Sequence, residues 1–298
     1  RAAEPSSGGA GSPGAAGMPA DDAGAPDTNV SVHPTRAISN PPTYLGGSGC
    51  MNPYRTTGFA PSDTNEPNPL FLYFVGTRFV DSDTSARFDS QAAAKVTEAM
   101  ARRGFVALSV EYDNGIADVL NNKLDCLYGK NSTETLLGKA CAMSGVDCSR
   151  GIATWGHSQG ALLAHMAATF DARVKAVWTT GYGGIDNPTL PSSRLRVVNG
   201  EADAMNAAVA TLNKTTGLSS GECPADGRDH CLRADGSGWV IVRKTACVTS
   251  MADHCWFDRR SCADSSITLE PNWIDAKSNT LFALEGNADW VAETVRRP

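Results

Sequence analysis

Long hydrophobic runs are missing from this sequence. Although 41% of its 298 residues are hydrophobic, they stand in short segments, and none approaches the roughly 20 consecutive apolar residues that cross a bilayer. A surplus of positive charge is missing too, because 26 lysines and arginines face 32 aspartates and glutamates. A chain that binds nucleic acid through its phosphates needs such a surplus. We therefore expect a soluble globular protein with neither a membrane span nor a nucleic-acid partner.

The cysteines include no Cys-x-x-Cys pair, so the usual zinc-binding and thioredoxin-like spacings are absent and we expect no metal site. Nine cysteines are present nevertheless. Three pairs lie close together in the sequence, as suits local disulfides formed in an oxidising compartment: Cys141 with Cys148, Cys223 with Cys231, and Cys255 with Cys262. An odd count leaves at least one thiol free or paired with another chain.

The first residues differ in composition from the rest. Residues 1–28 are mostly Ala, Gly, Pro and Ser, and such segments bury too little apolar surface to offset the entropy of ordering. We expect residues 1–38 to be a disordered spacer and residues 39–298 to form a single domain. Together with the cysteines, this predicts a protein that is secreted, or held at the surface or in the periplasm, of a bacterium.

From about residue 40 onward, short β-branched or aromatic runs alternate with helical patterns, which is typical of an α/β protein with a mostly parallel sheet. Strands are expected at 70–75, 105–112, 152–155, 174–180, 195–198 and 239–242, and helices at 90–103, 161–170 and 279–296.

The pentapeptide Gly156-His157-Ser158-Gln159-Gly160 lies between an expected strand and an expected helix. A Gly-x-Ser-x-Gly motif in that context is typical of a nucleophile elbow, a sharp turn that exposes the serine at the end of the sheet. The glycines are needed because side chains there would collide with neighbouring backbone. Ser158 is therefore the candidate nucleophile, and the backbone N–H of Gln159 is a candidate oxyanion donor.

Together with an acid after a later strand and a histidine after the last one, this motif resembles the α/β-hydrolase superfamily. Within it, the chain is most similar to secreted serine esterases of the cutinase-like, polyester-depolymerase-like and feruloyl-esterase-like kinds. The resemblance extends from about residue 40 to the C-terminus. It implies an α/β-hydrolase fold, the chain order serine, acid, histidine, and hydrolysis of carboxylic esters through an acyl-enzyme without a cofactor.

The acid is expected after the strand at 195–198, in the turn Asn199-Gly200-Glu201-Ala202-Asp203, which resembles the turn that carries the carboxylate in this superfamily. Asp203 is the first candidate. Asp186, after the preceding strand, is the alternative, because some relatives place the acid there.

Five histidines are candidates for the general base. His254 follows the last expected strand by about ten residues, where the resemblance places the base, and a disulfide at Cys255 would restrict its loop. His230, before that strand, is the alternative. Positions disfavour the other three, His33 before any strand, His157 inside the elbow and His165 within a helix. The odd thiol is expected at Cys50 or in the segment before Ser158, and not beside the base.

The second oxyanion donor is expected from the loop after the strand at 70–75. Many relatives have His-Gly there, but this chain has Val75-Gly76-Thr77-Arg78. The backbone N–H of Thr77 is the first candidate and that of Arg78 the next.

Only about a dozen residues separate the strands at 174–180 and 195–198, so no large lid domain fits there. This predicts an open site for bulky or polymeric esters, in a protein that acts as a monomer. Tyr182, Trp239 and Trp256 are candidate platforms for an aromatic or sugar group, although a core position is expected first. A serine peptidase with the same triad and a noncatalytic surface-binding homologue remain the alternative functions.

Overall fold

The computed structural model describes most of the chain after residue 31. The described residues are 32–45, 50, 52–78, 86–115, 120–129, 133–185, 187–204, 208–223, 229–259, 262, 268–275, 277 and 281–297. Asp186, the alternative acid, and most of the expected spacer lie outside them.

A nine-stranded sheet runs through the middle of the protein in the order β1-β2-β4-β3-β5-β6-β7-β9-β8. The strands are β1 (Thr35–Ala37), β2 (Thr56–Pro61), β3 (Leu70–Phe74), β4 (Val106–Val110), β5 (Ile152–His157), β6 (Val174–Thr180), β7 (Leu195–Gly200), β8 (His230–Leu232) and β9 (Gly238–Val242). The six strands from β4 to β9 in this order pair in parallel, whereas β1, β2 and β8 pair antiparallel at the two edges. The six expected strands are these six parallel ones, because strands buried on both faces have the continuous apolar runs that sequence reveals.

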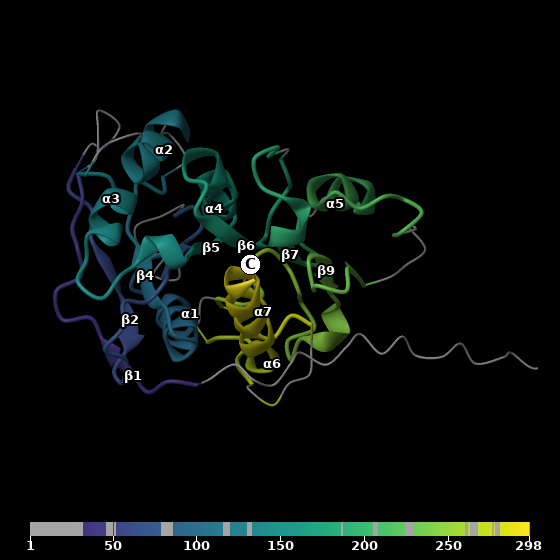
Figure 1. Cartoon of the computed structure of the whole chain (residues 1–298). Helices are drawn as coiled ribbons and strands as arrows, with labels where there is room; N and C mark the ends of the chain where they lie inside the picture. Colours follow the sequence, from purple (N-terminus) through teal and green to yellow (C-terminus); the bar gives the residue numbers. More distant parts are fainter. Residues whose placement is uncertain are drawn as a thin grey trace, which may run out of the picture.

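Helices cover both faces of the sheet (Figure 1). They are α1 (Gln91–Arg102), α2 (Leu120–Tyr128), α3 (Leu136–Cys141), α4 (Gln159–Phe170), α5 (Val209–Thr216), α6 (Pro271–Ile274) and α7 (Leu284–Arg296). Helix α1 packs beside α7, and α4 packs against β5 and β6. Figure 1 thus shows the expected α/β architecture, a mostly parallel sheet flanked by helices. Among the described helices, none is long and apolar enough to cross a membrane.

No large domain is inserted between β6 and β7. Residues 181–194, all described except 186, contain a single 3-10 turn, Ser192–Arg194. The expectation that this connection is too short for a large lid domain is confirmed.

The position of the site follows from the strand order. Helix α1 leads from β3 to β4 on one side, and α4 leads from β5 to β6 on the other. Because right-handed crossovers that run in opposite directions place their helices on opposite faces, the carboxyl ends of β3 and β5 are where a ligand site is expected in such a sheet. Ser158 follows β5 at this point.

Two expectations need correction. The spacer boundary at residue 38 is too late, since β1 (Thr35–Ala37) pairs with β2 and so already belongs to the sheet. A three-residue edge strand leaves no clear pattern in the sequence, which is why it was missed.

The odd thiol was also misplaced. Cys50 pairs with Cys126, the three expected local disulfides are present, and the free cysteine is the buried Cys247. It lies in the segment that leads to His254, and burial raises the pKa of its thiol to about 12. Its position was not foreseen because the long-range partner of Cys50 depends on the tertiary fold.

Candidate active site

The elbow has the backbone that the Gly-x-Ser-x-Gly pattern predicts. Ser158 lies between β5 and α4 with φ 55° and ψ −120°, a conformation that a non-glycine residue rarely adopts. A Cβ on Gly156 would stand 2.0 Å from the carbonyl oxygen of Gly160, and one on Gly160 would stand 2.2 Å from that of Phe74. Only glycine fits at these two positions, and the tight turn presents Ser158 at the end of the sheet.

The first turn of α4 offers N–H groups next to Ser158. The Ser158 side chain makes no capping hydrogen bond, and the first N–H groups of a helix have no partner within it. The N-terminal end of a helix also carries a partial positive charge. The backbone N–H of Gln159, the expected oxyanion donor, lies in this turn and is suited to bind an anion.

The loop after β3 approaches the same point. A Cβ on Gly76 would lie 3.3 Å from the Cβ of Ser158, so this loop touches the elbow. The next two residues differ. The N–H of Arg78 donates to the carbonyl of Asn114 at 3.1 Å, whereas the N–H of Thr77 makes no backbone hydrogen bond within the described part of the chain. Of the two residues weighed as the second donor, Arg78 therefore has its N–H engaged, which favours Thr77.

Asp203 and His254 meet, although 51 positions separate them in the sequence. Nδ1 of His254 lies 2.9 Å from Oδ1 of Asp203, and the Asp203 side chain is fully buried while that of His254 is 20% exposed. This bond fixes the orientation of the imidazole and leaves Nε2 as the nitrogen that can accept a proton.

The His254 ring also packs beside the elbow. Its centroid lies 4.6 Å from that of His157, the neighbour of Ser158. A Cβ on Gly181 would stand within 2.9 Å of both rings, so the two imidazoles enclose this glycine, whose φ is 59°. The structure therefore brings Ser158, Asp203 and His254 into one neighbourhood.

His157 itself takes no part in this arrangement as a base. Burial, and next the charge of His254, lower the pKa of His157 well below its ordinary value. Its ring packs edge-on against Phe257 at 4.7 Å and keeps its neutral form.

The alternative base His230 lies elsewhere. It belongs to the edge strand β8, which β6, β7 and β9 separate from β5, and its Nδ1 is 2.6 Å from Oδ1 of the adjacent Asp229. His33 is bonded to Asp63 and His165 to Tyr182. Neither of these two contacts involves the elbow.

On its upstream side, the loop that carries His254 is hydrogen-bonded to the turn that contains Asp203. The N–H of Ala202 donates to the carbonyl of Ala252 at 3.0 Å, and a Cβ on Gly200 would stand 2.1 Å from the same oxygen. Ala252 is buried and has φ 38°. The close contact holds the residue two positions before His254 against the turn that contains Asp203.

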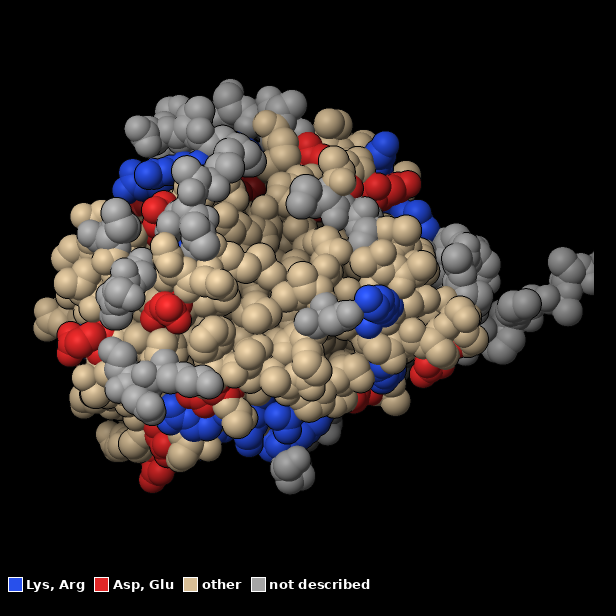
Figure 2. Space-filling model, turned by 90° about the horizontal axis from the view of Figure 1, so that it is seen from above, with Lys and Arg blue, Asp and Glu red and all other residues tan. Residues whose placement is uncertain are grey.

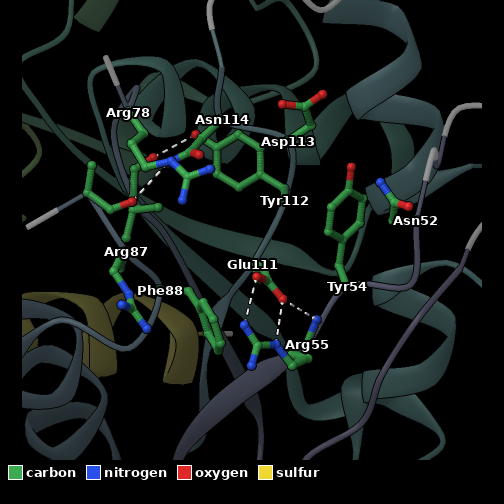
Figure 3. Close-up of a pocket in the computed structure, with 12 residues that line it drawn as sticks. Asn52, Tyr54, Arg55, Arg78, Arg87, Phe88, Glu111, Tyr112, Asp113 and Asn114 are labelled. Atoms are coloured by element: carbon green, nitrogen blue, oxygen red, sulfur yellow. Dashed lines mark hydrogen bonds and ion pairs between the residues drawn. The ribbon is translucent and has the colours of Figure 1, made fainter. Parts of the chain in front are cut away.

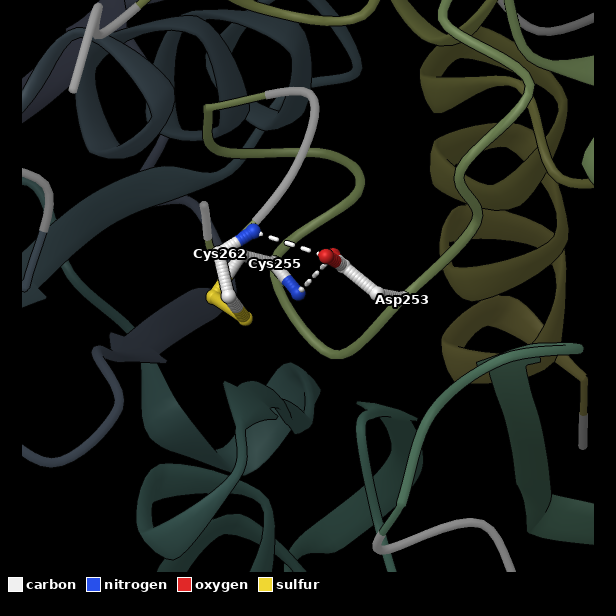
Figure 4. Close-up of side chains that lie close together, drawn as sticks. All are labelled: Asp253, Cys255 and Cys262. Carbon is white, nitrogen blue, oxygen red and sulfur yellow. Dashed lines mark hydrogen bonds between the residues drawn. A yellow bond between two sulfur atoms is a disulfide. The ribbon is translucent and has the colours of Figure 1, made fainter. Parts of the chain in front are cut away.

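Asp253 and a disulfide hold the downstream side (Figure 4). The Asp253 carboxylate accepts the backbone N–H groups of Cys255 at 3.0 Å and Cys262 at 2.8 Å, and the two cysteines are bonded to each other. Asp253 and the two sulfur atoms lie close enough for metal ligands. Metals bind cysteine as the free thiolate, however, and sulfur atoms joined in a disulfide are poor ligands. The cluster therefore stabilises the conformation of the loop.

The residues considered as aromatic platforms are all in the core. Tyr182, Trp239 and Trp256 are at most 4% exposed. The indole N–H of Trp239 donates to Asn213, and the Tyr182 hydroxyl lies 2.7 Å from His165 Nδ1. These side chains therefore occupy core positions, as was expected ahead of a role as platforms.

Sequence reasoning missed Lys123, a buried lysine on α2. Its Nζ donates to the side-chain Oε1 of Gln159 and to the carbonyl of Gly115, both at 3.0 Å. A positive charge is thereby fixed next to the residue whose N–H is the expected oxyanion donor. Nothing in the sequence of 120–128, where asparagines and an aspartate flank the lysine, indicates that Lys123 is buried or reveals its partner.

Comparisons with known proteins add similarities of overall shape. No protein-family model and no curated protein match the chain. Among solved structures, it is similar to a serine hydrolase without lid from Xanthomonas campestris (13% identity, 71% of this chain and 85% of that one, TM-score 0.43). It is also similar to Est1E from Butyrivibrio proteoclasticus (14% identity, 61% and 87%, TM-score 0.41).

A third similar structure is a hypothetical protein from Pseudomonas aeruginosa, at 17% identity and a TM-score of 0.33. The match covers 54% of this chain and 46% of that protein, so the chain spans less than half the length of this relative. At these values the similarities carry no argument about activity, which has to come from the site.

Proposed function

We propose that this protein is a serine esterase that hydrolyses carboxylic esters through a covalent acyl-enzyme. The observation that supports it most is the hydrogen bond between His254 and the buried Asp203, formed beside a serine in a strained elbow. A buried carboxylate paired with a partly exposed imidazole next to a serine is the arrangement that activates a hydroxyl group as nucleophile.

In the first half of the reaction, Oγ of Ser158 attacks the ester carbonyl and passes its proton to Nε2 of His254. Asp203 holds the Nδ1–H tautomer and stabilises the imidazolium that forms. The proton then moves to the leaving alcohol as the acyl-enzyme appears. In the second half, His254 takes a proton from a water molecule as its oxygen attacks the acyl group. The acid is released when Oγ of Ser158 leaves and regains a proton from His254.

The tetrahedral intermediates carry a negative oxygen that needs hydrogen-bond donors. We assign this role to the backbone N–H groups of Gln159 and Thr77, which come from the α4 terminus and from the loop next to it. Donors placed in advance at this point are worth about 3 kcal/mol each in comparable sites.

The surroundings fit an enzyme that acts outside the cytoplasm on accessible esters. Four disulfides are consistent with an oxidising compartment. The short β6–β7 connection fits an open site for bulky or polymeric substrates. We further propose a secreted or cell-surface bacterial protein that works as a monomer.

The test is a substrate panel with matched variants. Wild type should hydrolyse p-nitrophenyl acetate and butyrate, and Ser158→Ala and His254→Ala should each lower kcat/KM about a thousandfold or more. His230→Ala is the control and should retain activity, while Asp203→Asn against Asp186→Asn decides between the two acids. Turnover that survives in Ser158→Ala would refute the nucleophile, and preference for a peptide anilide would favour the peptidase.

A further inference from the structure

A polar pocket of about 470 Å³ lies at the carboxyl ends of β3 and β4, outside the triad (Figure 3). It shares a wall with the site, since Val75 lines it and the next residue, Gly76, touches Ser158. Two hydrogen bonds brace this wall from the pocket side. The Tyr112 hydroxyl donates to the carbonyl of Val75 at 2.6 Å, and Asn114 Nδ2 donates to that of Gly76 at 2.8 Å.

The charged groups of the pocket are balanced. Arg55 binds Glu111 through two parallel bonds of 2.9 and 3.0 Å, and Arg87 binds Asp89 in the same way, with both bonds 2.8 Å. Arg78 and Asp113 are the remaining charged residues of the lining, and Asp89 lies just outside it. Among the described residues at the pocket, three guanidinium groups therefore stand beside three carboxylates once Asp89 is included.

The protonation of the Arg55–Glu111 pair is fixed at neutral pH. Partial burial alone would raise the pKa of Glu111, but the hydrogen bonds and charge of Arg55 lower it overall. The same bond raises the pKa of Arg55. The pair thus presents oriented donors and acceptors without a net charge, and a bidentate bond uses only part of the five N–H donors of a guanidinium group.

Aromatic faces surround these groups. Figure 3 shows the Arg55–Glu111 pair at one end and Arg78 at the other, with the rings of Tyr54, Phe88 and Tyr112 around the space between them. The Arg55 guanidinium lies 5.0 Å from the Phe88 ring centroid, which further fixes its plane.

This combination selects a ligand class. An anion or cation would add a net charge to a balanced pocket and would have to be desolvated without a matching partner. A purely apolar group would leave the paired donors and acceptors without their water. A neutral molecule with several hydroxyl groups and an apolar C–H face satisfies both the fixed polar groups and the rings.

We propose that this pocket binds a sugar, and that the esters hydrolysed at Ser158 are those of a sugar hydroxyl. The inference rests on the proposed esterase function. The sugar ring would occupy the pocket on one side of the Val75–Gly76 wall while its ester group reaches Ser158 on the other.

The experiment compares two acetate esters of equal ring size, methyl glucoside 6-acetate and cyclohexylmethyl acetate, with p-nitrophenyl acetate as a substrate that does not need the pocket. Wild type should prefer the sugar ester about tenfold or more in kcat/KM. Arg55→Gln should remove about tenfold of that preference, mainly through KM, as expected for a hydrogen bond to a charged group. Turnover of p-nitrophenyl acetate should stay within about twofold.

Two further variants distinguish a loss of binding in the pocket from a loss of protein stability. Asn52→Ala alters an exposed lining residue and should lower the sugar preference without affecting unfolding. Arg36→Gln, on the exposed face of β1, is the matched control and should change nothing. Equal rates for the two ring esters, or an equal loss on all substrates in Arg55→Gln, would overturn the proposal, as would a stronger preference for p-nitrophenyl hemisuccinate.

A binding measurement tests the sugar site independently of ester hydrolysis. Saturation-transfer NMR with the methyl glycosides of glucose, galactose, xylose and arabinose should show binding of at least one, weakened in Arg55→Gln and retained in Ser158→Ala. Binding without ester turnover would refute the esterase and the sugar-ester proposal while keeping a sugar site. Ester turnover with none of the four glycosides bound would refute the sugar site alone.

Discussion

The two sides of the candidate site are built in different ways. The nucleophile side consists of consecutive residues, 156–160, whose shape comes from backbone strain and from glycines pressed against neighbouring carbonyls. The base side is assembled from residues far apart, and a disulfide, the Asp253 carboxylate and the contact with the Asp203 turn hold it in place. The nucleophile side therefore depends on close packing, and the base side on cross-links. This difference is open to experiment.

Gly160→Ala should have the largest effect. Its Cβ would stand 2.2 and 2.4 Å from two main-chain oxygen atoms of β3 and its loop, which cannot move aside easily. We expect the free energy of unfolding to fall by about 3 kcal/mol or more, measured by urea denaturation, with activity lost. Gly286→Ala in α7 is the control, because nothing lies within 4 Å there, and it should gain about 0.5 to 1 kcal/mol. Equal effects would contradict the packing account of the elbow.

Low pH should reduce the stability of the folded protein through His165, a buried residue of α4 on the nucleophile side. Burial lowers its pKa from 6.5 to about 4, so between these values the unfolded chain binds a proton that the folded protein does not. Stability should therefore fall as the pH drops from about 6.5 to 4, by up to about 3 kcal/mol from this group.

His165→Gln removes the titrating group and should lose less stability than wild type between pH 7 and 4.5 in urea unfolding. The variant also loses the contact with Tyr182. The difference in stability between the two proteins at pH 7 measures that loss, so that it can be separated from the effect of pH. Identical pH dependence of the two proteins would show that His165 does not contribute.

The base side is tested by two disulfides of equal span. Cys255→Ala/Cys262→Ala and Cys141→Ala/Cys148→Ala each open a loop with a sequence separation of 7. Both should lower the free energy of unfolding by about 2 kcal/mol. Only the first should also lower kcat, about tenfold, because it frees the loop that presents His254. A loss of kcat in both variants, or in neither, would show that the disulfide does not position the base.

The smallest expected effect concerns Lys123, which joins α2 to the elbow. Lys123→Met removes the bond to Gln159 and the nearby positive charge, so kcat should fall about tenfold with little change in KM, if the charge supports the oxyanion. The exposed Lys95→Met on α1 is the control for helix and charge. A rise in KM with unchanged kcat would assign Lys123 to substrate binding instead.

The parts of the molecule that sequence predicted well are those with a local physical cause. The six parallel strands follow from continuous apolar runs, and α1 begins one residue after Ser90, whose side chain caps it. The elbow follows from two glycines and a strand-to-helix change. The antiparallel strands β1, β2 and β8 were not expected, because short or half-exposed strands leave weak patterns.

The candidate triad is an intermediate case. Asp203 and His254 were chosen from chain order and a resemblance, and the structure brings their side chains together. That choice could not have come from local pattern alone, since nothing near Asp203 in the sequence indicates a contact with residue 254.

The sequence by itself determined the class of the sheet, the elbow and the three local disulfides, because each depends on residues a few positions apart. Only the tertiary structure decided the unpaired Cys247, the placement of Lys123 beside Gln159 and the balanced pocket next to Ser158. These depend on loops from distant strands meeting at one edge of the sheet, and the energies that bring them there are spread over the whole core.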